Sequence, residues 1–194
     1  MAYRKRYEYL TNKEQLQNTI NRHKEKGSIR KISKIGKGEP TLNLERAHNE
    51  LKLAESALKI SKSSQLKEEL GLFEEDTFYS GTITHAYYTI FFATKALLLK
   101  SNIKTRSPNV HKATLDAFAK YWVINSKLDV KLLEIYKSNM VKADTLLNLL
   151  VTEREKRGRF TYKKMPDANK QPAEQSLNNA EEFLRHTRRI SGVK

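Results

Sequence analysis

The stretch TFYSGTITHAYYTIFFATKALLLKSN, residues 77–102, contains the most apolar part of this chain. From Ile83 onward its apolar residues point in every direction around a helix, with Lys95 as the main interruption. A helix that is hydrophobic on all sides belongs in the middle of a bundle, where other helices cover it. The run is too short and too interrupted to read as a membrane span. We therefore expect a central, buried helix.

Four further segments outside this stretch read as helices that pack around it. Residues 42–62 place Leu44, Ala47, Leu51, Ala54 and Leu58 at alternating spacings of three and four, which is typical of an amphipathic helix. The other three segments are 108–124, 128–157 and 173–190. Pro108 would lie in the first turn of its helix. Residues 63–75 read as a connection. The predicted fold is all-α, an up-and-down bundle of four to five helices spanning residues 41–194.

The first forty residues read as a basic N-terminal extension. Residues 11–26 have a thin apolar stripe and a possible capping box formed by Thr11 and Glu14, and Gly27 would end this helix. Residues 28–40 are basic and contain Gly36, Gly38 and Pro40, which predicts a linker. We expect one extra basic helix attached to the bundle.

Charge is the strongest global signal, with 37 Lys and Arg against 22 Asp and Glu for a net charge of +15. The excess lies at the ends: residues 1–40, 41–152 and 153–194 carry net charges of +7, +3 and +5. Localised positive charge attracts polyanions by releasing their counterions, although it also serves solubility. We expect a nucleic-acid partner. No secretory leader is visible after MAYRKRYEYL, so a cytoplasmic location is expected.

Known catalytic and cofactor motifs are missing from the sequence. There is no cysteine, no HExxH, no glycine-rich phosphate loop and no GxSxG elbow. The sequence therefore predicts neither a metal site nor a cofactor.

Two places could carry chemistry. In KTRSPNVHKATLDAF, residues 104–118, Arg106 precedes His111 by five positions, a spacing that suits a ribonuclease site but also a helix-start histidine bonded to a neighbouring helix. Farther on, basic residues are interleaved with aromatic ones, which suits single-stranded RNA but also a solvated helix end. This second cluster comprises Arg154, Lys156, Arg157, Arg159, Phe160, Tyr162, Lys163 and Lys164.

Three segments together resemble HEPN-domain proteins: HAYYTIFFATKALLLKSNIKTRSPNVHKATLDAF (85–118), REKRGRFTYKK (154–164) and AEQSLNNAEEFLRHTRRI (173–190). The resemblance covers about residues 42–190. It implies a small helical bundle that forms a homodimer, acts on RNA as a toxin or defence component, and in some members pairs with a minimal nucleotidyltransferase.

The resemblance also assigns roles. Active members carry an arginine and, four to six residues later, a histidine; this chain has Tyr162 five positions after Arg157, and no histidine until His186. Tyrosine, with an ordinary pKa near 10, is a poor general base. We expect Arg157 to hold phosphate and His111 or Tyr162 to move protons in a metal-independent endoribonuclease, with His111 approaching Arg157 and Tyr162 in the folded chain. The alternatives are a non-catalytic RNA- or nucleotide-binding module and a docking partner of a nucleotidyltransferase.

Overall fold

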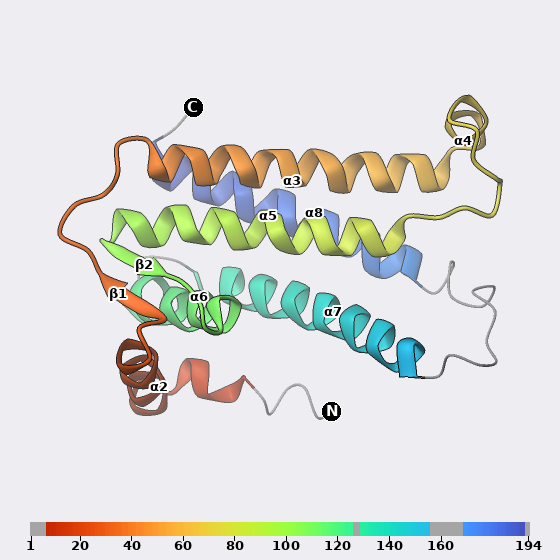
Figure 1. The fold of residues 1–194 in the computed structure, drawn as a ribbon. Coiled ribbons are helices and arrows are strands. Elements are labelled where there is room, and N and C mark those ends of the chain that lie inside the picture. Colours follow the sequence, from red (N-terminus) through yellow and green to blue (C-terminus); the bar gives the residue numbers. More distant parts are fainter. Residues whose placement is uncertain (1–6, 126–128, 156–168, 193–194) are drawn as a thin grey trace.

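The computed structural model describes residues 7–125, 129–155 and 169–192, with the side chains of 145–155 left out of the description. Seven α-helices are formed by these residues and pack as a bundle (Figure 1). Helix α5, Tyr79–Lys100, lies in the middle and contacts helices α3, α6, α7 and α8. The predictions of a helical bundle and of a central helix over residues 77–102 are both confirmed.

The helices that cover α5 form where the sequence has amphipathic stripes. Helix α3, Glu39–Lys62, buries Leu44, Ala47, Leu51 and Ala54 against its neighbours. Helix α7 spans Val130–Glu155 and helix α8 spans Lys170–Ser191, with Phe183 of α8 completely buried. In Figure 1, α3 and α7 lie on either side of α5, and α8 runs behind it. A short helix, α4, Ser64–Glu69, occupies the predicted connection after α3.

The start of the third bundle helix differs from the prediction. Pro108 is not in its first turn: the Ser107–Pro108 peptide is cis, Asn109 has a φ of 59°, and helix α6 begins at Val110 and ends at Phe118. A π-helical turn, η2, Ala119–Val123, continues it. Strand β2, Ile103–Thr105, lies between α5 and α6 in the chain.

The residues predicted as a linker contain a strand. Strand β1, Ile29–Lys31, pairs antiparallel with β2, with Arg30 opposite Lys104. The linker prediction was wrong at these residues because strand pairing depends on a segment more than seventy residues away in the sequence. Whether residues 1–40 form a separate unit stays a prediction, but Leu10, Leu16 and Ile20 join the main core.

The extra N-terminal helix is present as α2, Lys13–Glu25, preceded by a 3₁₀ turn, η1, Glu8–Thr11. Its cap is one residue later than predicted, because the side chain of Asn12, and not Thr11, accepts from the backbone N–H of Gln15. No helix formed by the described residues has the length and hydropathy needed to cross a bilayer.

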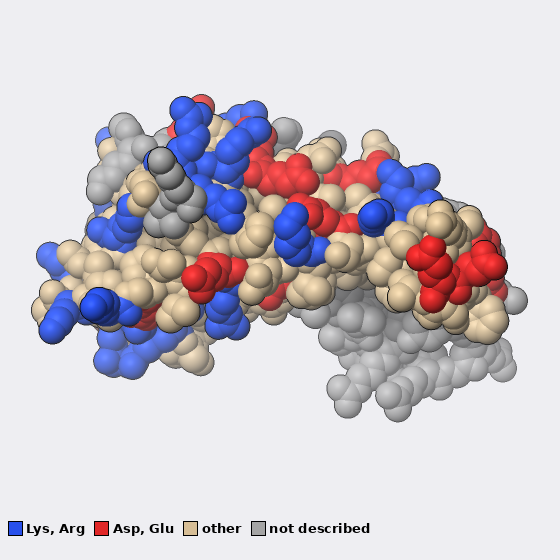
Figure 2. Space-filling view, turned by 90° about the horizontal axis from the view of Figure 1, so that it is seen from above, with Lys and Arg blue, Asp and Glu red and all other residues tan. Residues whose placement is uncertain are grey.

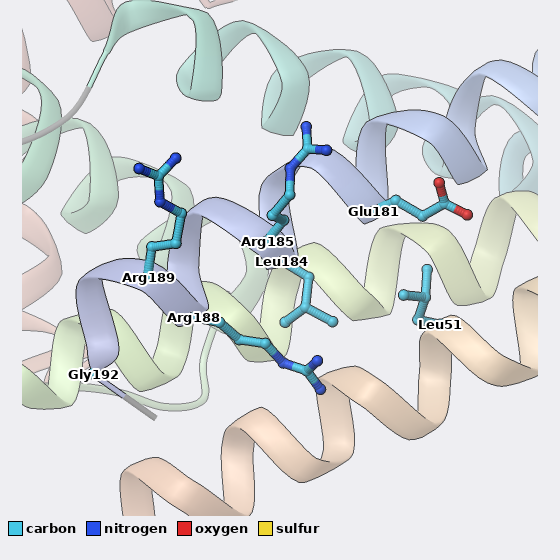
Figure 3. A pocket seen from close by; sticks show the side chains of 7 residues that line it. All are labelled: Leu51, Glu181, Leu184, Arg185, Arg188, Arg189 and Gly192. Atoms are coloured by element: carbon cyan, nitrogen blue, oxygen red, sulfur yellow. The ribbon is translucent and has the colours of Figure 1, made fainter. Parts of the chain in front are cut away.

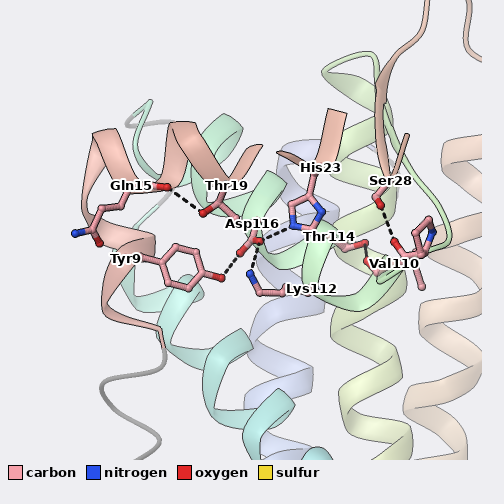
Figure 4. Close-up of polar contacts among 10 residues, drawn as sticks. Tyr9, Gln15, Thr19, His23, Ser28, Val110, Lys112, Thr114 and Asp116 are labelled. Carbon is pink, nitrogen blue, oxygen red and sulfur yellow. Dashed lines mark hydrogen bonds and ion pairs between the residues drawn. The ribbon is translucent and has the colours of Figure 1, made fainter. Parts of the chain in front are cut away.

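A buried carboxylate holds the N-terminal segment on the bundle (Figure 4). Asp116 of α6 is completely buried and accepts from Tyr9 Oη at 2.6 Å and from His23 Nε2 at 2.8 Å. Lys112 Nζ lies 3.4 Å from the same carboxylate at the protein surface. A buried carboxylate is tolerated only when such donors replace the water it has lost.

We predict that Asp116→Ala lowers the free energy of unfolding by about 3 kcal/mol, because the substitution removes the buried carboxylate to which both His23 and Tyr9 bond. Urea denaturation measures the change. Lys112→Ala is the control and should cost less than about 1 kcal/mol, since its ammonium group is half exposed. Equal losses in the two variants would contradict the role of Asp116 in holding the segment.

Candidate functional site

His111 occupies the first turn of α6, and its position is held from two sides. Ser28 Oγ donates to the carbonyl oxygen of Pro108 at 2.7 Å, just before the helix. Thr114 Oγ1 donates to the carbonyl oxygen of Val110 at 2.7 Å (Figure 4). The same hydroxyl lies 2.8 Å from the hydroxyl oxygen of Thr105 on β2. The N-terminal segment and β2 therefore both help to orient the turn that carries the imidazole.

The imidazole of His111 is bonded to the central helix. Its Nδ1 lies 2.7 Å from the hydroxyl oxygen of Tyr87 on α5, so the prediction of a helix-start histidine bonded to a neighbouring helix is confirmed. The rings of Phe91, Tyr87 and Tyr88 lie with their centroids 4.6, 5.7 and 6.0 Å from that of His111. No described residue forms a hydrogen bond with its Nε2.

This environment favours the neutral imidazole. Partial burial lowers the pKa of His111, and the positive charge of Lys95 lowers it further, while the carboxylate of Asp144 acts in the opposite direction. The pKa of Tyr87 is raised, first by burial and then by the charge of Asp144, so its hydroxyl keeps its proton at neutral pH. A neutral imidazole with Nε2 unbonded can accept or donate a proton.

Cations lie beside the same aromatic residues. The Nζ atom of Lys95 is 5.5 Å from the ring centroid of Phe91, and the guanidinium carbon of Arg46 on α3 is 4.3 Å from that of Phe92. Burial lowers the pKa of Lys95, and the nearby charges of Arg46 and Lys104 add to this effect. Several positive charges in one place, only partly solvated, favour an anionic group such as a phosphate.

We name the His111 cluster as His111, Tyr87, Lys95, Arg46 and Asp144. It comes from four helices, α6, α5, α3 and α7. Of these five residues, the sequence singled out only His111 as a candidate site residue. The available signal was Lys95, which stands one helical turn after Phe91 in an otherwise apolar run, since a charge is placed in such a run only where it has a partner or a function.

Most of the second predicted cluster lies outside the described residues. This holds for Lys156, Arg157, Arg159, Phe160, Tyr162, Lys163 and Lys164. Arg154 is in the last turn of α7, and its side chain is likewise outside the description. The composite site of His111 with Arg157 and Tyr162 therefore stays a prediction.

Arg106 and His111 are bonded to different parts of the molecule. Arg106 Nε donates to the carbonyl oxygen of Gly27 at 3.0 Å, whereas His111 is bonded to Tyr87. This arrangement gives no support to a self-contained Arg106–His111 site. Among the described residues, no three His, Asp or Glu side chains are grouped as metal ligands would be.

We predict that Lys95→Met raises the pKa of His111 and that Asp144→Asn lowers it, because each change removes one of the two opposing charges. Titration of the His111 ring proton by NMR, starting from a wild-type value below the ordinary 6.5, measures both shifts. Lys59→Met, on the exposed surface of α3, is the control and should leave the titration unchanged. Shifts of the same sign in both cluster variants would contradict the assignment.

Comparison with known proteins agrees with this architecture. The family model described as HEPN domain matches residues 55–190, well over half of the chain. The chain is also 37% identical over 76 residues to the Methanocaldococcus jannaschii protein named "Putative toxin MJ0142". That match covers 39% of this chain and 48% of the relative, so it spans about half of the relative's length. No solved structure matches. The extent of the family match, together with the helical bundle, shows that this chain belongs to the HEPN domain family.

Proposed function

We propose that this HEPN-domain protein binds RNA and cleaves it as a metal-independent endoribonuclease, in the role of a toxin or defence component. The observation that carries the proposal is His111, a half-buried imidazole with a lowered pKa that is bonded to Tyr87, has cations nearby and has no hydrogen bond from its Nε2 to any described residue. The relative named as a toxin supports the biological role. A homodimer is the expected assembly.

Phosphate binding is the first step of the proposed reaction. Lys95 and Arg46 present positive charge beside Phe91 and Phe92. These charges can bind the phosphates of an RNA strand, whereas Phe91 and Phe92 are buried and cannot stack on a base. Arg157, five positions before Tyr162 in the basic segment, is proposed to hold the scissile phosphate through its planar guanidinium.

Proton transfer is the second step. We assign the proton of the neutral imidazole to Nδ1, which donates to the hydroxyl oxygen of Tyr87, so that Nε2 of His111 has a lone pair. Nε2 takes the proton of a ribose 2′-hydroxyl, whose oxygen then attacks the adjacent phosphorus and displaces the 5′-oxygen of the next nucleotide. The products are a 2′,3′-cyclic phosphate and a 5′-hydroxyl, with Tyr162 proposed to return a proton to the leaving oxygen. The raised pKa of Tyr87 keeps that hydroxyl protonated, so it orients the imidazole without taking part in the transfer.

We predict that His111→Ala lowers the cleavage rate by about 10²–10⁴-fold, the usual contribution of a general base. Arg157→Ala should abolish cleavage because it removes the proposed phosphate ligand. The assay incubates purified protein with mixed RNA in EDTA. His186→Ala is the matched control, since His186 is an exposed histidine of α8 and should not affect the rate.

The pH profile provides an independent check on this assignment. Because the base must be unprotonated, the rate should rise with pH through the lowered pKa of His111, and Lys95→Met should move the inflection to higher pH. Intact RNA beside an active control nuclease would overturn the enzymatic proposal. Salt-dependent RNA binding without cleavage would instead support the non-catalytic module.

Docking to a partner protein is the second candidate function, and the apolar surface near α4 favours it. Phe73 is 73% exposed and Leu70 is 56% exposed. Large apolar side chains exposed next to each other are typical of interaction sites. A minimal nucleotidyltransferase is the partner we propose, as expected of some members of the family.

We predict that Leu70→Asp with Phe73→Asp abolishes copurification with a coexpressed minimal nucleotidyltransferase, because charge cannot enter an apolar contact without a cost. Leu42→Asp is the control, since Leu42 is 58% exposed near the start of α3, far along the chain from Leu70 and Phe73. Copurification that survives the double change would remove this surface from consideration.

A further inference from the structure

A groove between α3 and α8 carries an arginine cluster that the proposed reaction does not use (Figure 3). It has a volume of about 600 Å³. Leu51 of α3 and Leu184 of α8 form its apolar floor, and the other lining side chains all come from α8: Arg185, Arg188, Arg189 and, at one end, Glu181. None of these residues belongs to the His111 cluster. We call this surface the α8 groove.

Within the described part of the chain, the three arginines have no hydrogen-bond or ion-pair partner that would occupy their guanidinium groups. None of them forms an ion pair with a carboxylate of a described residue. Arg185 is close enough to Glu182 to help lower the pKa of that carboxyl, but Glu182 already bonds Lys131 Nζ at 2.7 Å. Guanidinium groups left unpaired on a surface are available to an anionic ligand.

Helix capping does not explain the arginines either. Basic side chains often lie at helix C-termini because they neutralise the exposed carbonyl groups. In α8 this task is performed from another helix, because Lys100 Nζ donates to the carbonyl oxygens of Ile190 and Ser191. The positive charge of the three arginines is therefore additional to what the helix end requires.

The directions of the side chains indicate the shape of the ligand. In Figure 3, Arg188 extends toward α3, whereas Arg185 and Arg189 lie on the other side of α8. Guanidinium groups that converge can enclose one phosphate, but these three are spread along and across the helix. Such an arrangement suits a ligand with several phosphates in a row, and the leucine floor can accept an apolar face of a base.

The distribution of charged side chains over the surface also favours an anionic ligand at the α8 groove. Seen from above α3, the Lys and Arg side chains gather toward the end where α3 begins and α8 ends, and acidic side chains gather around α4 (Figure 2). A polyanion approaching this face is therefore drawn to the α8 end and repelled from the α4 end. Single-stranded RNA is the polyanion that the proposed function already requires.

We propose that the α8 groove is a second RNA-binding surface, which holds the backbone of a single strand away from the His111 cluster. The proposal rests on the proposed function only for the identity of the ligand. It assigns Arg185, Arg188 and Arg189 to phosphates, and it gives them a role in binding and not in bond cleavage.

The test measures binding of a labelled 2′-O-methyl RNA oligomer by fluorescence anisotropy at several salt concentrations. The methyl group blocks the 2′-oxygen, so the probe is not cleaved and binding is measured apart from catalysis. Each phosphate contact on a single strand contributes about 0.7 to the slope of log K against log salt. The variant with Arg185→Gln, Arg188→Gln and Arg189→Gln should therefore lose about 2 units of slope.

A variant with the same change in net charge controls for general electrostatics. Lys52→Gln, Lys59→Gln and Lys62→Gln removes three exposed charges from α3 outside the groove, and should change the slope much less. A similar loss in both triple variants, or an unchanged slope in the arginine variant, would overturn the proposal. Binding of ATP that depends on the arginines, with an unchanged RNA slope, would also overturn it and indicate a mononucleotide site.

Cleavage of unmodified RNA separates this inference from the proposed function. The arginine variant should show a higher KM with an unchanged kcat, because the groove binds substrate without taking part in the chemistry. Wild-type protein that binds the probe but cleaves no RNA would end the enzymatic proposal and leave the groove supported. Wild-type protein that binds no RNA would overturn both.

Discussion

Burial of α5 imposes the arrangement of the rest of the molecule. Its side chains from Ile83 to Leu99 are almost all inaccessible to water, and no single neighbour can cover a helix that is apolar on every side. Helices α3, α6, α7 and α8 therefore pack around it. Each of them packs one apolar stripe against α5 and exposes its other side to solvent, so that together they bury the apolar surface of the central helix.

The same constraint creates the candidate site. Polar groups on a buried helix must find partners, because an unpaired polar group loses its hydrogen bonds to water. The hydroxyl of Tyr87 finds its partner in His111 on the next helix. Lys95 stays only half covered, and its charge acts on the imidazole that Tyr87 holds. A histidine with a lowered pKa thus follows from how the central helix is packed.

The N-terminal segment contributes to the site indirectly. Its contacts with Asp116 and its strand pairing with β2 lie on either side of the turn that carries His111. The segment predicted as a basic extension therefore also helps to hold α6 in place. The α8 groove, by contrast, forms at the other side of α5, where α3 and α8 meet.

The sequence by itself determined the helices and the central place of α5. Hydrophobic periodicity is a local property, so the ranges 42–62, 77–102 and 173–190 correspond closely to helices α3, α5 and α8. It also singled out His111, and the bond to a neighbouring helix was among the alternatives weighed. Local sequence signals gave wrong predictions at two places. The residues of β1 were predicted to form a linker, because their pairing strand is remote in the sequence, and Pro108 was predicted to lie in the first turn of α6.

Only the tertiary structure decided which side chains meet. Tyr87 and Lys95 of α5 and Asp144 of α7 come close to His111, and Arg46 of α3 lies near Lys95, although nothing in their spacing along the chain indicates it. The three arginines of α8 likewise become one surface only when Leu51 of α3 completes the groove floor. Helix formation depends on neighbours three and four residues apart, whereas a pKa or a binding groove depends on distances in space.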